Sequence, residues 1–159
     1  MMKKLLFIPA ILFSSIAYSA PKTNYVMDLD LANQLAINVM KACMDTTKPA
    51  AVVILDQSGN VMVSQRHETV GIHNLIAAQR KAFTAYSSKI PTLQFMRNAQ
   101  NNLDSQNLTS LPELLLLGGG VPVIYKNQLL GAVGVAGAGG SIQDDKCAQQ
   151  GIETTLKQI

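Results

Sequence analysis

The chain has 159 residues, of which 48% are hydrophobic and 14% are charged, so it can bury a substantial core and is not intrinsically disordered. The formal net charge is +3, but two lysines belong to an N-terminal segment that we expect to be removed, and 11 basic minus 10 acidic side chains leaves +1. This small excess excludes a nucleic-acid binder that relies on a basic surface.

The N-terminal residues follow the pattern of a secretory signal peptide. Lys3 and Lys4 precede an apolar run over residues 5–17, and small residues follow that run. The apolar run is shorter than the roughly 20 residues that a membrane-spanning helix needs. The pattern therefore favours a cleaved leader over an uncleaved membrane anchor.

The position of cleavage follows from the small residues after the apolar run. Cleavage after Ser19 places small side chains at both specificity positions, whereas cleavage after Ala20 places the bulky Tyr18 in one of them. We expect a signal peptide over residues 1–19 and a single domain over residues 20–159. The mature protein would then be periplasmic or secreted, with no membrane span.

The first half of the domain changes from helical to strand periodicity. Apolar residues recur every four positions from Leu31 to Cys43, which predicts an amphipathic helix over residues 30–45. Two apolar runs rich in valine then flank a polar turn at residues 56–60. They predict a β-hairpin of strands 51–55 and 61–65.

A second helix is predicted over residues 73–87. Its large apolar side chains lie on one side of the helical wheel, with alanines at neighbouring positions. These large side chains are Ile72, Ile76, Phe83 and Tyr86.

The second half of the domain repeats the order of helix, hairpin and helix. The expected elements are a short helix over 92–102, a loop over 103–117, strands 121–125 and 129–136, and a helix from Ser141 to the C-terminus. Antiparallel hairpins separated by helices favour an α+β fold, with one sheet covered on both faces, over parallel βαβ units.

Five segments in this order resemble the haem-binding or haem-degrading domain family that includes GlcG and HbpS. The similarity spans nearly all of residues 28–157. The segments are AVVILDQSGNVMVSQRH (51–67), QRKAFTA (79–85), GGVPV (119–123), GAVGVAG (131–137) and QDDKCAQQGI (143–152). The resemblance implies a profilin-like αβα sandwich with a central antiparallel sheet, assembly into homo-oligomers, and non-covalent binding of haem or a related tetrapyrrole in some relatives.

Two departures from the family pattern lie near the expected ligand-facing loops. Ala136 stands where the family usually has a serine, and His67, Glu68 and Thr69 replace the usual Met-Asp-Gly after the second strand. These departures affect the identity of the ligand more than the fold.

The second helix carries the first set of candidate ligand-binding residues. His73, Ala77, Lys81 and Thr84 follow one another at intervals of four, four and three residues, so they share one helix face. Neutral imidazole is a common axial ligand of haem iron, and Arg80 or Lys81 could bind its propionates. The alternative is a solvated helix face with no ligand.

The end of the second strand carries the other candidates. His67 is an alternative ligand of haem iron, and Arg66 is an alternative partner for a propionate. The alternative interpretation of both residues is a polar strand end.

Catalysis is not indicated by any constellation of residues. The sequence contains two histidines and lacks GxSxG, so a nucleophile with a base is not supported. The glycines at 137–140 precede a helix and could bind an anion, although tight turns explain them equally well. Any haem breakdown would depend on iron and peroxide, and no catalytic residue is predicted.

The function predicted from these observations is binding of a small-molecule ligand outside the cytoplasm. We expect an exported non-covalent binder of haem or a related small anionic ligand, possible roles being scavenging or sensing. The alternative is an accessory protein or enzyme of small hydroxy-acid metabolism of the glycolate type, and a third possibility is a purely structural module.

Two cysteines, Cys43 and Cys147, remain after removal of the leader. Cys43 ends the first helix and Cys147 begins the last, so antiparallel packing of those helices would bring the two thiols together. We expect a disulfide, which an oxidising compartment permits. The alternative is a pair of buried free cysteines that act as small hydrophobic side chains.

Overall fold

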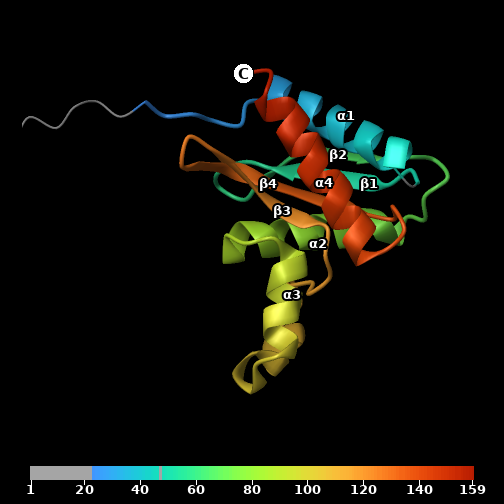
Figure 1. Cartoon of the computed structure of the whole chain (residues 1–159), viewed down its shortest axis with the longest axis vertical. Coiled ribbons are helices and arrows are strands. Elements are labelled where there is room, and N and C mark those ends of the chain that lie inside the picture. Colours follow the sequence, from blue (N-terminus) through green and yellow to red (C-terminus); the bar gives the residue numbers. More distant parts are fainter. Residues whose placement is uncertain (1–22, 47) are drawn as a thin grey trace, which may run out of the picture.

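The fold is built on one four-stranded antiparallel sheet with helices on both faces (Figure 1). The computed structural model describes residues 23–46 and 48–159. The predicted signal peptide over residues 1–19 lies outside the described residues. Within the described residues, no helix is both long and apolar enough to span a membrane.

The helices and strands begin and end close to the predicted positions. The helices are α1 (Leu29–Thr46), α2 (His73–Ser88), α3 (Thr92–Gln100) and α4 (Ser141–Leu156), and the strands are β1 (Ala51–Leu55), β2 (Val61–Arg66), β3 (Gly120–Tyr125) and β4 (Gln128–Ala136). The stretch predicted as a loop begins instead with a 3-10 helix, η1 (Leu103–Ser110). Together α3 and η1 project from the rest of the domain (Figure 1).

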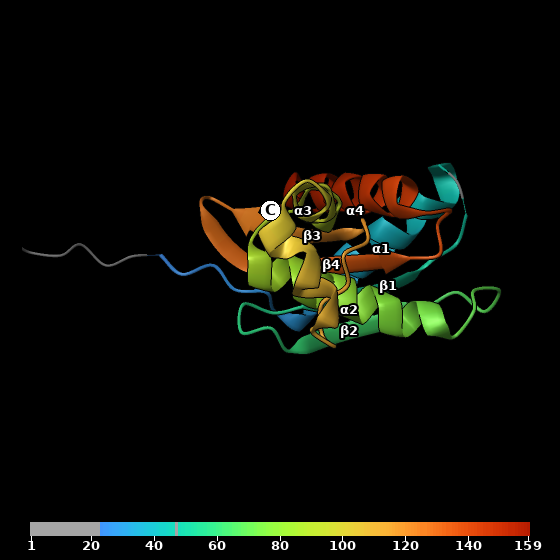
Figure 2. The same cartoon turned by 90° about the horizontal axis from the view of Figure 1, so that it is seen from below.

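The strand order is β2-β1-β4-β3, and each neighbouring pair is antiparallel. The helices α1 and α4 pack side by side on one face of the sheet, and α2 covers the other face (Figures 1 and 2). This arrangement confirms the predicted α+β class and αβα sandwich.

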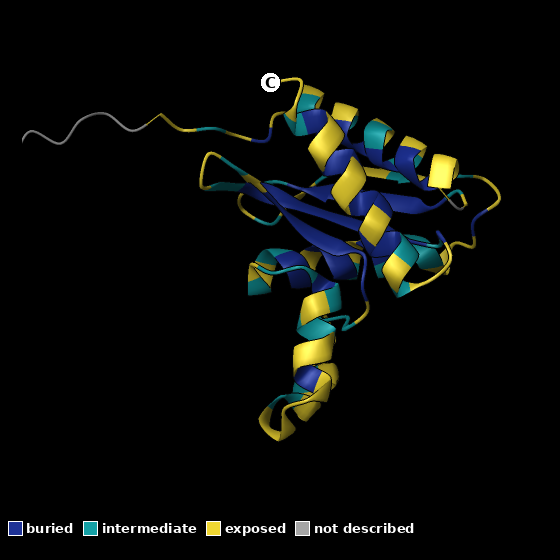
Figure 3. Cartoon of the chain, viewed as in Figure 1, coloured by how far each residue is buried: buried dark blue, intermediate teal, exposed yellow. Residues whose placement is uncertain are grey.

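The core has two parts because the sheet is covered on both faces, and its strands are largely buried (Figure 3). The part under α1 and α4 contains large side chains such as Leu35, Val39 and Ile54. The part under α2 is thinner and contains Ala78 and Ala82.

The face of α2 that packs on the sheet is not the face that carries its large isoleucine side chains. Ile72 and Ile76 are 75% and 64% exposed, whereas Ala78 and Ala82 are fully buried against the sheet. A Cβ atom added to Gly134 of β4 would lie 1.9 Å from the Ala78 carbonyl oxygen, so the helix backbone rests directly on the strand. Only small side chains fit between them, which forces the large ones outward.

The predicted disulfide between Cys43 and Cys147 is present, with the two Cα atoms 4.9 Å apart. Both residues are fully buried between α1 and α4. One turn further along α4, a Cβ atom on Gly151 would lie 2.5 Å from Val39 Cα, so the two helices are in close backbone contact there as well. The disulfide thus links two helices that already pack tightly.

Replacement of both cysteines by alanine should lower the free energy of unfolding by about 2–5 kcal/mol, because the disulfide closes a long loop and so restricts the unfolded chain. Urea unfolding of the oxidised protein and of the Cys43→Ala, Cys147→Ala variant measures the difference. The parent protein treated with a dithiol reductant should approach the variant. Two reactive thiols in the unfolded, non-reduced parent would contradict the disulfide.

Candidate functional site

The candidate site lies at the end of the sheet where β1 and β3 begin and β2 and β4 end. The register places Ala51 opposite both Arg66 and Ala136, so the connections before β1, after β2 and after β4 meet at this end (Figure 1). A cavity of about 490 Å³ opens here between the first half of α2 and the start of α4. Its polar lining residues are His73, Asn74, Lys81, Ser141 and Asp144.

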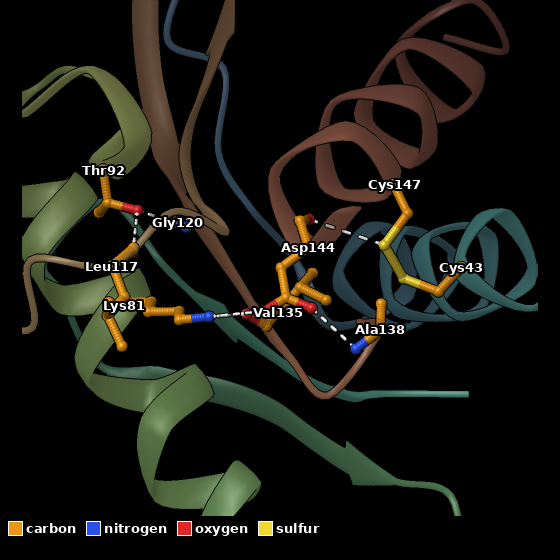
Figure 4. A network of polar contacts seen from close by, with 9 residues as sticks. All are labelled: Cys43, Lys81, Thr92, Leu117, Gly120, Val135, Ala138, Asp144 and Cys147. Atoms are coloured by element: carbon orange, nitrogen blue, oxygen red, sulfur yellow. Dashed lines mark hydrogen bonds and ion pairs between the residues drawn. A yellow bond between two sulfur atoms is a disulfide. The ribbon is translucent and has the colours of Figure 1, made fainter. Parts of the chain in front are cut away.

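A buried ion pair between Lys81 and Asp144 forms part of the cavity wall (Figure 4). The Lys81 ammonium donates to Asp144 Oδ2 at 2.7 Å and to the Val135 carbonyl oxygen at 2.9 Å. The backbone N–H of Ala138 donates to Asp144 Oδ1 at 2.8 Å. The carboxylate of Asp144 therefore has partners on both oxygens.

Asp144 lies in the first turn of α4 and is nevertheless buried. Asp144 and Lys81 are each 3% exposed. The position in the first turn of α4 does stabilise a carboxylate. The residue is buried, however, because the chain turns back over the end of β4, where the Asp144 side chain meets the Ala138 N–H and the Lys81 side chain from α2.

Lys81 keeps one hydrogen-bond donor beyond these two bonds. An ammonium group has three N–H donors, and within the described residues Lys81 uses two of them. Because Lys81 also lines the cavity, the third N–H is the donor that a bound acceptor could use.

The chain before β3 is shaped to pass close to Lys81. A Cβ atom on Gly119, where φ is +120°, would lie 3.1 Å from Lys81 Nζ, and one on Gly120 would lie 2.1 Å from the Lys81 carbonyl oxygen. The hydroxyl of Thr92 accepts from the Gly120 N–H and donates to the Leu117 carbonyl, both at 2.8 Å (Figure 4). These contacts hold segment 117–120 against α2 and against the first residue of α3.

Of the predicted ligand-binding residues, His73 and Lys81 line the cavity. His73 begins α2 and is exposed, and neither of its ring nitrogens has a hydrogen-bond partner among the described residues. The structure therefore places an unpaired imidazole and a buried ammonium along the same helix, two turns apart.

The residues at the end of β2 have other contacts. The Arg66 guanidinium donates to the carbonyl oxygens of His67, Glu68 and Val70. The His67 ring lies 2.8 Å from Thr69 Oγ1 and 3.5 Å from the carboxylate of Glu68. Neither Arg66 nor His67 lines the cavity.

Arg80 and Thr84 also point away from the cavity. Arg80 donates to the Leu114 carbonyl at 2.7 Å, and the Thr84 hydroxyl accepts from the Leu115 N–H at 2.9 Å. Both residues hold the segment before β3 against α2. Thr84 does not share a common exposed face with His73, because it is fully buried.

The sequence interpretation missed Asn74, Ser141 and Asp144 as lining residues. Asp144 lies in the QDDKCAQQGI segment, whose resemblance to the family was a usable signal. Its pairing with Lys81 had no local signal, because 63 residues separate the two partners. No group of three or more His, Cys, Asp or Glu side chains that could hold a metal ion occurs within the described part of the chain.

Asp145 has a different environment from its neighbour Asp144. Its Oδ2 accepts from Gln149 Nε2 at 2.6 Å, whereas its buried Oδ1 has no partner in ordinary hydrogen-bond geometry. Burial raises the pKa of Asp145, and this effect exceeds the opposing effects of the Gln149 hydrogen bond, the Arg97 charge, the Gly119 N–H and the Lys81 charge.

Breaking the buried ion pair from one side should be costly. Lys81→Met leaves the Asp144 carboxylate buried without its countercharge and should lower the free energy of unfolding by about 3–5 kcal/mol. Asp144→Asn and the double variant complete a double-mutant cycle, measured by urea unfolding. Strict additivity of the two single effects would contradict a direct interaction.

Asp145→Asn should stabilise the protein at pH 7. Because burial raises the pKa of the native carboxyl, the native state binds its proton more tightly than the unfolded state, so ionisation favours unfolding. The destabilisation is complete above the raised pKa and disappears below the usual value of 3.8. Thermal unfolding of parent and variant should therefore show a difference that closes as the pH falls; a difference that grows on acidification would contradict the raised pKa.

Solved structures of known proteins are similar to this structure. The crystal structure of a double mutant of HbpS from Streptomyces reticuli has a TM-score of 0.74 and 28% sequence identity, and the match covers 92% of this chain and 98% of that one. Protein ORFY from Klebsiella pneumoniae has a TM-score of 0.77 and 26% identity, over 89% of this chain and 99% of that one.

A structure of PduOC in complex with heme has a TM-score of 0.70 and 23% identity, over 81% of this chain and 94% of that one, a similarity that establishes the shared fold. The model of the family described as "Haem degrading protein HbpS-like" matches residues 27–153. Because this match covers most of its length, the chain belongs to the HbpS-like family.

Proposed function

We propose that this protein binds haem non-covalently in the cavity between α2 and α4, where His73 would hold the iron. The observation that carries the proposal is an imidazole without a hydrogen-bond partner at the rim of a cavity of about 490 Å³. Membership of the HbpS-like family supports it, as does the fold shared with PduOC, which has been crystallised with heme.

The walls of the cavity suit a flat, largely apolar ring. Small and apolar residues line it between the polar ones, namely Ala77, Leu117, Ala136 and Gly137. The Lys81 ammonium and the N-terminal end of α4 at Gly140 and Ser141 present N–H donors to a carboxylate. When bound, haem supplies redox chemistry at its iron, and the protein residues bind and orient it.

His73 is a better candidate ligand than His67. An imidazole that binds iron needs a free lone pair on one ring nitrogen. His67 Nδ1 lies beside Thr69 and Glu68, which leaves its Nε2 available, so both histidines meet this condition and their positions decide between them. His67 also lies outside the lining of the α2/α4 cavity.

The same proposal includes a location outside the cytoplasm. Cleavage after Ser19 would release the mature protein to the periplasm or medium, where an oxidising environment preserves the Cys43 to Cys147 disulfide. Scavenging or sensing of haem fits this location. Homo-oligomer formation is supported by the exposed apolar side chains of Ile72 and Ile76 on α2.

A second candidate ligand is a small carboxylate of the hydroxy-acid type in the same cavity. The observation that favours it is the third N–H of Lys81 beside the start of α4, because the two together form an anion-binding arrangement. This ligand would need no iron and no histidine, which separates the two candidates by experiment.

Titration of the mature protein with haemin should give a saturable, shifted Soret band. His73→Ala should lose the shift and weaken binding by about tenfold or more, equivalent to ~1.4 kcal/mol or more of binding free energy. His67→Ala is the matched control and should bind as the parent does.

The other results of this titration would overturn part or all of the proposal. Loss of the band in His67→Ala alone would assign the iron to His67 and overturn the role of His73. An unshifted, unsaturable spectrum would overturn haem binding. Calorimetric titration with glycolate would then test the carboxylate candidate.

A further inference from the structure

A separate cavity of about 260 Å³ lies between α3 and α4. It shares no lining residue with the cavity between α2 and α4. Its lining combines one carboxylate, one guanidinium, three side-chain amides and two apolar side chains. A molecule bound here would therefore be a second ligand, held without His73.

Asp145 is the acidic residue of this cavity and is almost completely buried, with 5% of its surface exposed. Its Oδ2 accepts from the amide of Gln149, and its Oδ1 has no partner in ordinary hydrogen-bond geometry. Among the ion pairs of the described residues, none includes Asp145. The protein thus buries this negative charge without a countercharge in contact with it.

The preceding residue, Asp144, has the partners that Asp145 lacks. Asp144 pairs with the Lys81 ammonium at 2.7 Å and accepts from the Ala138 N–H at 2.8 Å. Burial of Asp145 is not offset in this way and raises the pKa of its carboxyl. A charged group that costs stability at the wall of a cavity is typical of a binding site, where a ligand supplies the missing partner.

Arg97 supplies a positive charge to the same cavity. It is exposed on α3, and it forms no ion pair with any residue that the structure describes. Its charge opposes the rise in the pKa of Asp145, although the two groups do not pair in contact. The cavity therefore offers an anion and a cation, each without a contact partner of opposite charge.

The other lining residues fit a small molecule that carries both charges. The amides of Gln94, Asn98 and Gln149 can donate and accept hydrogen bonds, and Pro91 and Leu93 add an apolar surface. Pockets for drug-sized ligands measure roughly 300–1,000 Å³, so this cavity of about 260 Å³ suits a smaller metabolite.

We propose that the cavity between α3 and α4 binds a free α-amino acid with an apolar side chain, its ammonium on Asp145 and its carboxylate on Arg97. The ammonium supplies the countercharge that Asp145 lacks. The planar guanidinium can donate two parallel hydrogen bonds to the carboxylate. The apolar side chain contacts Pro91 and Leu93. This site is additional to the proposed haem site and does not depend on it.

Calorimetric titration with L-leucine tests the two charged contacts. Asp145→Asn should weaken binding by about tenfold or more, and Arg97→Gln by about three- to fivefold, because the arginine is more exposed. Lys146→Gln is the matched control, since Lys146 is an exposed cation beside Asp145 in the sequence that does not line the cavity. Asp145→Asn is expected to stabilise the fold, so unfolding would not explain its loss of binding.

Two analogues of leucine separate the two charges of the ligand. Leucinamide keeps the ammonium and lacks the carboxylate, whereas 4-methylpentanoate keeps the carboxylate and lacks the ammonium. Each should bind the parent more weakly than leucine does, and Arg97→Gln should not weaken the binding of leucinamide further. Binding of either analogue as tightly as leucine would overturn recognition of both charges.

The remaining outcomes also decide the proposal. Absence of leucine binding by the parent, or equal binding by the parent and Asp145→Asn, would overturn it. His73→Ala should bind leucine as the parent does, because His73 lies outside this cavity. Loss of leucine binding in His73→Ala would place the ligand between α2 and α4 and overturn the separate site. Failure of haemin to bind would leave the leucine prediction unchanged, so the two proposals fail independently.

Discussion

The buried ion pair between Lys81 and Asp144 is the interaction on which the arrangement of the site depends. It joins α2 on one face of the sheet to α4 on the other, around the end of β4. Two charges taken out of water are costly unless their remaining hydrogen-bonding groups are satisfied. Here Val135 and Ala138 supply those partners from the backbone, so the pair is stable only when the end of β4 and the first turn of α4 are correctly placed.

The pair can form because α2 lies unusually close to the sheet. Gly134 in β4 and Gly120 in β3 leave no Cβ between strand and helix, and the Lys81 backbone rests against Gly120. The lysine side chain can then pass along the strand end and reach Asp144. The same close approach turns Ile72 and Ile76 outward, so one packing constraint sets both the buried wall of the cavity and the exposed apolar face of α2.

A structural feature could be predicted from the sequence when neighbouring residues determine it, and could not when distant parts of the chain determine it. Helices and strands were predictable because periodicity is local, and the disulfide because antiparallel helices bring Cys43 to Cys147. The burial of α2 was predicted wrongly, since periodicity could not reveal that glycines on another strand exclude large side chains. Asp144 and Asp145 are adjacent in sequence, yet only the tertiary fold distinguishes a paired carboxylate from one with an unsatisfied oxygen.

The disulfide and the ion pair act on the same turn of α4. Asp144 and Cys147 are three residues apart, so their side chains project from neighbouring positions of the helix surface. Cys147 fixes this turn to α1 above the sheet, and Asp144 fixes it to α2 below the sheet (Figure 4). The residues of α4 that line the cavity, Ser141 among them, are therefore held from both layers before any ligand arrives. Such preorganisation lowers the entropy that binding would otherwise cost.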